Sequence, residues 1–145
     1  MTTPPHMKGM TMGHLEDFVN AAVQTIGWTT HIMTENEGEH YENGVPIEFA
    51  DESYQWEDLA SEVEAANREE LVSFFEEHYE ALLSLSADFD QHGHDYVLTA
   101  GGHGAGFWDR GYPKDIEAPI TADARCGTSD HYVWVDSAGT LHYEN

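Results

Sequence analysis

The sequence predicts an α+β fold in which two or three helices pack on a small antiparallel sheet formed by two C-terminal hairpins. Two observations support this. Apolar residues recur at helical spacing in the first two thirds of the chain, and glycines and β-forming residues gather in the last third. A chain of 145 residues is long enough to bury a core without disulfides. We expect a flexible arm over residues 1–13 and a single domain over residues 14–145.

The first helix is expected over residues 14–26. Gly27 is a stop signal for it, and residues 28–33 fit either a short strand or an extended exit from the helix. Six apolar residues have the spacing of one helix face: Leu15, Phe18, Val19, Ala22, Val23 and Ile26.

Residues 34–54 are expected to form an acidic loop. Asn43-Gly44 and Pro46 are turn signals within it. A connection of this length without regular structure is uncommon in a compact domain, unless it is mobile or has a function. The loop is therefore a candidate functional segment.

Two further helices are expected after this loop. One begins near Gln55, where Trp56, Leu59 and Val63 form an apolar stripe. The other begins at Asn67, because Asn67 and Glu70 have the N-cap and N3 spacing of a capping box. Its apolar stripe includes Leu71, Phe74, Phe75 and Leu82, and its opposite face carries Glu69, Glu76, Glu77 and Glu80.

The last third is expected to hold the two hairpins. The first has strands over residues 95–100 and 105–109 with a glycine-rich turn between them, and residues 111–130 are expected to be irregular. The second has strands over residues 132–136 and 140–144. For the core we expect Tyr96, Leu98, Phe107 and Trp108 to pack against Phe18, Leu71 and Phe75.

The charge balance excludes several functions. The chain has 28 acidic residues against 5 Lys and Arg, a formal net charge of −23. Direct binding to nucleic acid or to an anionic membrane needs clustered cations, so neither is expected. No apolar run has the length of a membrane span. The one cysteine, Cys126, has no partner in the chain for a disulfide, which fits a reducing, cytosolic location.

The acidic residues are concentrated in the middle of the chain. Residues 34–90 contain 18 of the 28, with Arg68 as the only Lys or Arg. Such a block produces a strong negative field, which favours a partner with a basic surface. The candidate partner-binding residues are Glu35, Glu37, Glu39, Glu42, Asp51, Glu52, Glu57, Asp58, Glu69, Glu76, Glu77 and Glu80.

A second candidate site lies between His92 and Arg110. His and Asp side chains bind divalent metals, so His94, Asp95 and Asp109 form a candidate metal site. The alternative is structural: Asp109 pairs with Arg110 or accepts backbone N–H groups, and the glycines allow tight turns. Neither a phosphate-binding motif nor an activated nucleophile is indicated, and no cofactor is expected.

One segment resembles a family of small acidic proteins encoded by tailed phages, whose motif reads approximately H-D-F-x-L-T-R-N-G-H-G-A-G-F-W-D-R. Ala100 and Gly101 stand where that motif has Arg-Asn, and weaker similarity covers most of residues 14–111. The resemblance implies a phage origin and action in the host cytoplasm, and it names no activity. The matching residues are His94, Asp95, Gly102, His103, Gly104, Gly106, Phe107, Trp108, Asp109 and Arg110.

Three hypotheses for function follow. The first is a phage accessory protein that binds a host protein, for instance by presenting carboxylates in place of nucleic-acid phosphates to a DNA-binding surface, in an anti-host or anti-defence role. The second is a metal-dependent enzyme that uses the His/Asp hairpin. The third is an acidic protein adapted to high salt, which the presence of only two lysines, Lys8 and Lys114, favours.

Overall fold

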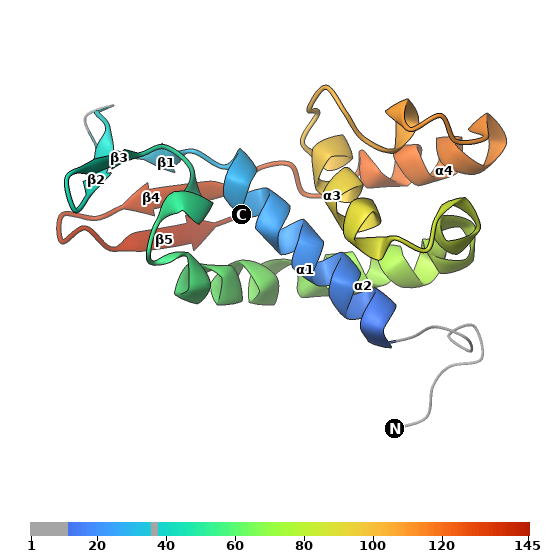
Figure 1. Ribbon diagram of the computed structural model, residues 1–145, viewed down its shortest axis with the longest axis horizontal. Coiled ribbons are helices and arrows are strands. Elements are labelled where there is room, and N and C mark those ends of the chain that lie inside the picture. The colour runs from blue at the N-terminus through green and yellow to red at the C-terminus, as the bar shows by residue number, and fades with distance from the viewer. Residues whose placement is uncertain (1–11, 36–37) are drawn as a thin grey trace.

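A computed structural model describes residues 12–35 and 38–145. Over these residues the fold is α+β and the helices dominate: a mixed three-strand sheet and a separate two-strand hairpin accompany four helices (Figure 1). The helices are α1 Met12–Thr29, α2 Trp56–Leu85, α3 Phe89–Ala100 and α4 Lys114–Ala124. The strands are β1 Ile32–Met33, β2 His40–Glu42, β3 Val45–Ile47, β4 Tyr132–Val135 and β5 Leu141–Glu144, and two 3-10 turns are η2 Ala50–Glu52 and η3 Phe107–Asp109.

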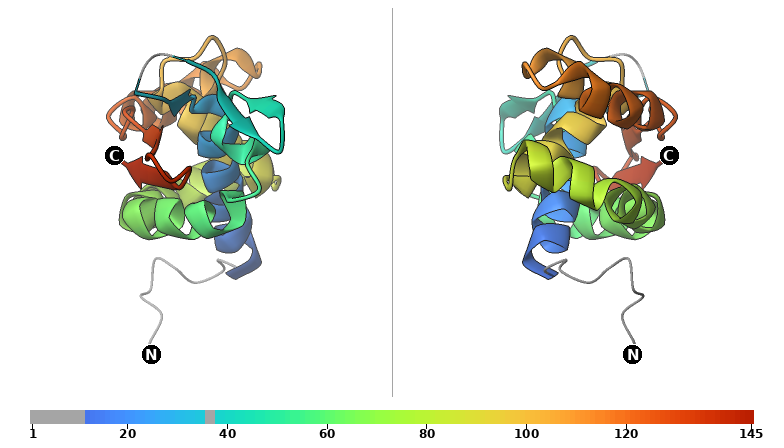
Figure 2. Two further views of the ribbon diagram at one scale, coloured as in Figure 1. Left: turned by 90° about the vertical axis from the view of Figure 1, so that its left-hand side faces the viewer. Right: turned by 90° about the vertical axis from the view of Figure 1, so that its right-hand side faces the viewer.

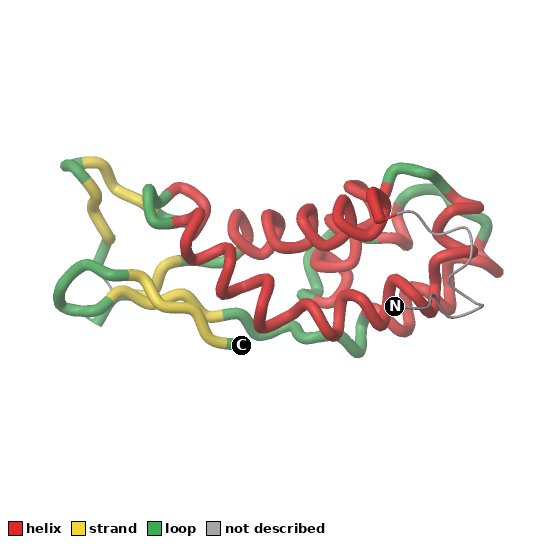
Figure 3. Tube along the Cα trace, turned by 90° about the horizontal axis from the view of Figure 1, so that it is seen from below, coloured by secondary structure: helices red, strands yellow, loops and turns green. Residues whose placement is uncertain are grey.

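The molecule is elongated, with strands at one end and α3 and α4 at the other (Figures 1 and 3). The long helix α2 runs along its length, and α1 crosses α2 obliquely (Figures 1 and 2). No helix in the described ranges is both long enough and apolar enough to cross a membrane. The fold thus brings α1 against α2 and α3 and leaves one side of α2 facing solvent.

The prediction of the first helix is confirmed, although α1 is longer than expected at both ends. Its apolar stripe, including Phe18, Val19 and Ala22, is buried. Gly93 on α3 allows the close crossing with α1, because a Cβ at this position would collide with the backbone oxygen of Phe18. Residues 12 and 13 belong to α1, and the remainder of the predicted arm lies outside the described residues.

The predicted break before Asn67 is wrong, because α2 continues through it. Asn67 is buried in the middle of the helix, where its Nδ2 donates to the carbonyl oxygen of Val63 and to the hydroxyl of Tyr143, both at 2.8 Å. These bonds satisfy a buried amide without ending the helix. The capping-box spacing is therefore coincidental here.

The predicted hairpin over residues 95–109 is also wrong, because residues 95–100 belong to helix α3. Asp88 caps the start of α3 by accepting a hydrogen bond from the Gln91 N–H. At its other end Gly102 has φ +69°, and the His103 N–H donates to the carbonyl oxygen of Leu98. This is a Schellman helix cap. A glycine with positive φ can end a helix as well as form a hairpin turn. Here it ends a helix, because residues 95–100 are buried as part of α3.

Residues 111–130, predicted to be irregular, contain helix α4. The predicted acidic loop over residues 34–54 likewise contains regular structure, since β2 and β3 form a hairpin there. Asn43 and Gly44 have φ values of 51° and 81°, which is the signature of a type I′ turn. The turn signal was therefore correct, while its flanking strands were missed.

The second C-terminal hairpin is confirmed as β4 and β5, with Val133 opposite Tyr143. The sheet is mixed rather than antiparallel, because β1 pairs in parallel with β4. The predicted strand or extended exit at residues 28–33 resolves into the end of α1 followed by β1. The core prediction is correct for Tyr96 and Phe107, which belong to the same buried cluster as Phe18, Leu71 and Phe75. Leu98 is buried outside that cluster, and Trp108 is 41% exposed.

Candidate partner-binding surface

An ion pair between a buried carboxylate and a partly exposed guanidinium joins the two ends of the motif segment. Asp95 is fully buried on α3, and the Arg110 Nη2 atom lies 2.6 Å from its Oδ1 atom. The Arg110 Nε atom lies 3.1 Å from both carboxylate oxygens, and Gln91 donates a further hydrogen bond to Oδ1. The bonds from Asp95 raise the pKa of Arg110 above its ordinary value. The pair joins α3 to a residue 15 positions further along the chain and has a structural role.

The residues between these ends support the same loop. Phe107 is buried, and its N–H donates to the Thr99 hydroxyl at 3.3 Å. Gly106 is required here because a Cβ would collide with that hydroxyl. Asp109 accepts a hydrogen bond from the Gly106 N–H at 3.2 Å, as the structural alternative predicted. Gly106, Phe107 and Asp109 thus hold the segment after α3 in place.

The candidate metal ligands His94, Asp95 and Asp109 do not converge on one point. The His94 ring stacks on Trp28 and its Nδ1 lies 3.1 Å from the Thr25 hydroxyl, whereas Asp95 faces Arg110. Burial, opposed by Asp95 and assisted by Arg110, lowers the pKa of His94. In the described part of the chain these three residues do not form a metal-ligand group. His103 and Gly104 are exposed in the loop. The arrangement does not support the metal-enzyme hypothesis at this place.

Helix α2 carries a line of carboxylates on its solvent side, which we call the acidic stripe. It consists of Asp58, Glu62, Glu69, Glu76 and Glu80. At 3.6 residues per turn these positions fall within a sector of roughly 40° and extend over roughly 33 Å. All are exposed except Glu76, which is half-buried. The stripe is therefore a line of carboxylates along one face of a rigid element.

The stripe lacks neutralising partners. Over residues 12–35 and 38–145, none of its carboxylates lies within 4.0 Å of a Lys, Arg or His nitrogen. Arg68, the nearest cation in sequence, pairs instead with Glu16 at 2.7 Å and with Glu64 at 3.4 Å. The sequence prediction included four of the five residues and missed Glu62, although its spacing from Asp58 and Glu69 places it on the same helix face.

The remaining predicted partner-binding residues do not belong to this surface. Glu42 is a structural residue with a side chain that is only 8% exposed, and it accepts hydrogen bonds from the hydroxyl of Ser53 at 2.6 Å and the N–H of Tyr54 at 3.2 Å. Glu52 accepts a hydrogen bond from the Phe49 N–H. Glu42 therefore has a structural role, and nothing in the structure supports its predicted role in partner binding.

Three of the other candidates are exposed but lie elsewhere. Glu35, Glu39 and Asp51 belong to the segment around the β2–β3 hairpin. In Figures 1 and 2 this hairpin lies above β4 and β5, whereas α2 lies below them. Glu57 is exposed in the first turn of α2, Glu77 faces α4, and Glu37 lies outside the described residues. The acidic block of the sequence is thus divided among separate surfaces.

Comparison with protein-family models, with curated proteins and with solved structures found no match. The resemblance to the phage family therefore stays a prediction from the motif. The most distinctive surface of the described residues is the acidic stripe.

Proposed function

We propose that the protein is a binding module that presents the acidic stripe of α2 to a basic surface on a partner protein. The observation that supports this is the alignment of five carboxylates on one solvent-facing side of a 30-residue helix, with no paired cation among the described residues. Unpaired charges on a rigid element attract an oppositely charged surface over distance and speed association.

The chemistry of the stripe favours a partner that binds nucleic acid. A strand of B-DNA carries one phosphate per roughly 3.4 Å, so the stripe covers the length of about ten phosphates with fewer charges. The interval between neighbouring stripe residues is about 6 Å or 10.5 Å at 1.5 Å per residue. The stripe can therefore occupy a groove lined with Lys and Arg, and the partner would be a DNA-binding protein of the host.

A phage accessory protein acting in the host cytoplasm fits this role, and the support for that part of the proposal is the motif in residues 94–111. Within the motif, Asp95, Phe107 and Arg110 have structural contacts, so we expect them to hold the segment after α3 in place rather than contact the partner. The stripe, and not the motif, is the surface to test.

The test is capture of host proteins from lysate on immobilised protein. One variant replaces the stripe residues by Asn at Asp58 and by Gln at Glu62, Glu69, Glu76 and Glu80. A matched control variant removes five exposed charges elsewhere, with Gln at Glu35 and Glu144 and Asn at Asp90, Asp115 and Asp130. We expect a DNA-binding protein to be captured by the wild type and by the control but lost with the stripe variant, and duplex DNA to displace it.

Two results would contradict the proposal. Equal capture by both variants would show that net charge, and not the stripe, retains the partner. Retention of only miscellaneous basic proteins, all released by about 150 mM salt, would show that the surface has no specific partner. Unfolding of the protein at low salt with recovery in molar KCl would instead favour adaptation to high salt.

A further inference from the structure

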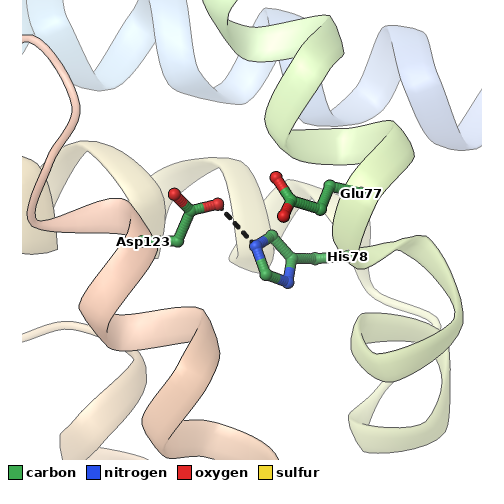
Figure 4. Close-up of side chains that lie close together, drawn as sticks. All are labelled: Glu77, His78 and Asp123. Carbon is green, nitrogen blue, oxygen red and sulfur yellow. Dashed lines mark hydrogen bonds and ion pairs between the residues drawn. The ribbon is translucent and has the colours of Figure 1, made fainter.

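We propose that Glu77, His78 and Asp123 form a binding site for a divalent transition-metal ion, with Zn²⁺ as the best match. Glu77 and His78 lie on α2 and Asp123 lies on α4 (Figure 4). One ligand atom from each of the three residues lies within 4.8 Å of the others. No other group of this kind occurs among residues 12–35 and 38–145.

The three side chains converge from two helices that are far apart in the sequence. The His78 Nε2 atom lies 2.6 Å from the Asp123 Oδ2 atom, and Figure 4 shows the Glu77 carboxylate beside this pair. The His78 side chain is 12% exposed, so its ring is held between the helices rather than free in solvent. The cluster is therefore largely preformed.

The cluster borders a hollow of about 160 Å³, and the walls of this hollow are acidic. Glu70 is fixed in the wall, where it accepts hydrogen bonds from the Thr128 N–H at 3.0 Å and the Thr128 hydroxyl at 2.9 Å. No Lys or Arg nitrogen in the described segments lies within 4.0 Å of Glu70, Glu77 or Asp123. The carboxylates of Glu70, Glu77 and Asp123 thus line one small hollow. Among the described residues, the basic side chain that pairs with one of them is His78, which contacts Asp123.

A fourth side chain, Tyr96, is affected by the same negative charges. Tyr96 lines the hollow, and its hydroxyl lies against Gly127, another lining residue. Its burial, followed by the charges of Glu70 and then Asp123, raises the pKa of that hydroxyl well above its ordinary value. Gly127 leaves room for this hydroxyl, since a Cβ there would collide with it. A cation placed in the hollow would relieve the repulsion between the carboxylates.

The ligand set indicates the class of ion. An imidazole nitrogen and two carboxylate oxygens suit Zn²⁺, whereas Mg²⁺ and Ca²⁺ prefer oxygen ligands alone. Zinc bonds of about 2.0–2.2 Å place tetrahedral ligands roughly 3.3 Å apart. The ion would replace the proton between His78 and Asp123, and small side-chain rotations would bring Glu77 into contact. Three protein ligands leave a fourth position open to the hollow for water.

The experiment uses untagged, chelator-treated full-length protein titrated with Zn²⁺, Mn²⁺ or Mg²⁺ and followed by calorimetry. We expect one Zn²⁺ per chain, weaker Mn²⁺ binding and no Mg²⁺ binding. The His78→Ala and Asp123→Asn variants should lose the Zn²⁺ site. Co²⁺ in place of Zn²⁺ should give a visible absorption band that the His78→Ala variant lacks.

Glu77→Gln is the decisive variant, because it leaves the His78–Asp123 contact between the helices intact. We expect it to weaken Zn²⁺ binding by at least about tenfold. The controls are Glu80→Gln, on the same helix one turn away, and His103→Ala, an exposed histidine, both with unchanged affinity. Absence of stoichiometric Zn²⁺ binding, or equal binding by wild type, Glu77→Gln and His78→Ala, would overturn the proposal. Glu77, His78 and Asp123 do not belong to the acidic stripe. Either result of the Zn²⁺ experiment therefore leaves the partner-binding test unaffected.

Discussion

Asp95 and the acidic stripe carry the same chemical group in opposite surroundings. Asp95 is fully buried and receives hydrogen bonds from Arg110 and Gln91. The stripe carboxylates face solvent, and in the described part of the chain no basic side chain pairs with them. A buried charge must be paired to be tolerated, while a solvated one need not be. The difference separates charge that holds the fold together from charge that remains available to a partner.

The same contrast recurs within the β2–β3 segment. Glu42 is enclosed by Ser53, Gln55 and His40. Glu39 is exposed, and its one hydrogen bond within the described residues is accepted from the nearby Tyr41 hydroxyl at 2.6 Å. Both residues contribute equally to the charge count of the sequence. Their contributions to stability should differ widely, and substitutions at these positions and along α2 test this.

Arg110→Ala should give the largest effect. It leaves the Asp95 carboxylate buried with Gln91 as its remaining partner, and breaking a buried pair in this way costs about 3–5 kcal/mol. Because Arg110 is itself 31% exposed, water can reach part of the site and we expect about 3 kcal/mol. Urea unfolding followed by circular dichroism measures the loss.

The control for Arg110→Ala is Arg125→Ala, which removes an exposed cation without an ion pair in the described structure. It should change the free energy of unfolding by no more than about 0.5 kcal/mol. A similar small change in Arg110→Ala would show that the buried pair does not stabilise the fold.

Glu42→Gln should have the next largest effect, about 1.5–2 kcal/mol, because it removes the charge that receives several hydrogen bonds. Burial alone would raise the pKa of Glu42, but bonds from Ser53 and His40, and then from Tyr54 and Gln55, lower it below its ordinary value of 4.5. The folded state therefore binds the proton more weakly than the unfolded state, so stability from this group is complete above pH 4.5 and is lost as the pH falls through the lower folded pKa.

This pH dependence is the measurement for Glu42. The difference in unfolding free energy between wild type and Glu42→Gln should be constant near neutrality and should shrink as the pH is lowered past 4.5. Glu39→Gln should show no comparable loss. A difference that grew on acidification would contradict the assignment of Glu42 as a stabilising carboxylate.

Single substitutions in the stripe should give the smallest changes in the free energy of unfolding. These changes should be gains in stability, whereas Arg110→Ala and Glu42→Gln should give losses. Asp58 with Glu62, and Glu76 with Glu80, are like charges four residues apart on a helix, which repel by about 0.2–0.5 kcal/mol. Glu62→Gln and Glu80→Gln should therefore stabilise the protein slightly at low salt, and about 1 M NaCl should remove the gain.

Glu69→Gln is the matched control within the stripe, because residues 65, 66, 72 and 73 are uncharged. It should leave stability unchanged at either salt concentration. Losses of more than about 1 kcal/mol at any of these stripe positions would mean that the stripe takes part in folding, and would weaken its interpretation as a partner surface.

Local signals predicted some elements well and others poorly. The apolar spacing from Leu15 to Ile26 identified α1, and alternation around a Ser-Ala-Gly turn identified β4 and β5. In contrast, the β-forming residues Val97, Leu98 and Thr99 indicated a strand where the structure has a helix. Local propensity for strands is weak, and burial of α3 against α1 overrode it. The capping-box spacing at Asn67 failed because that signal does not report burial.

The acidic surface was predictable in part. Helical spacing alone places the carboxylates of α2 on one face, so Asp58, Glu69, Glu76 and Glu80 could be assigned from the chain. Glu42 could not be distinguished from Glu39, since only the packing of η2 and the start of α2 determines which of them is enclosed. The cluster at Glu77, His78 and Asp123 left no signal at all, because its ligands come from helices 45 residues apart.

By itself the amino-acid order determined the total charge, its concentration in the middle of the chain, the face of each periodic helix and the Asn-Gly turn. These properties depend on residues only a few positions apart. The tertiary structure decided which carboxylates are paired, which helix face stays in solvent and where α2 meets α4. Those outcomes depend on contacts between distant segments, and their free energies exist only once the chain has folded.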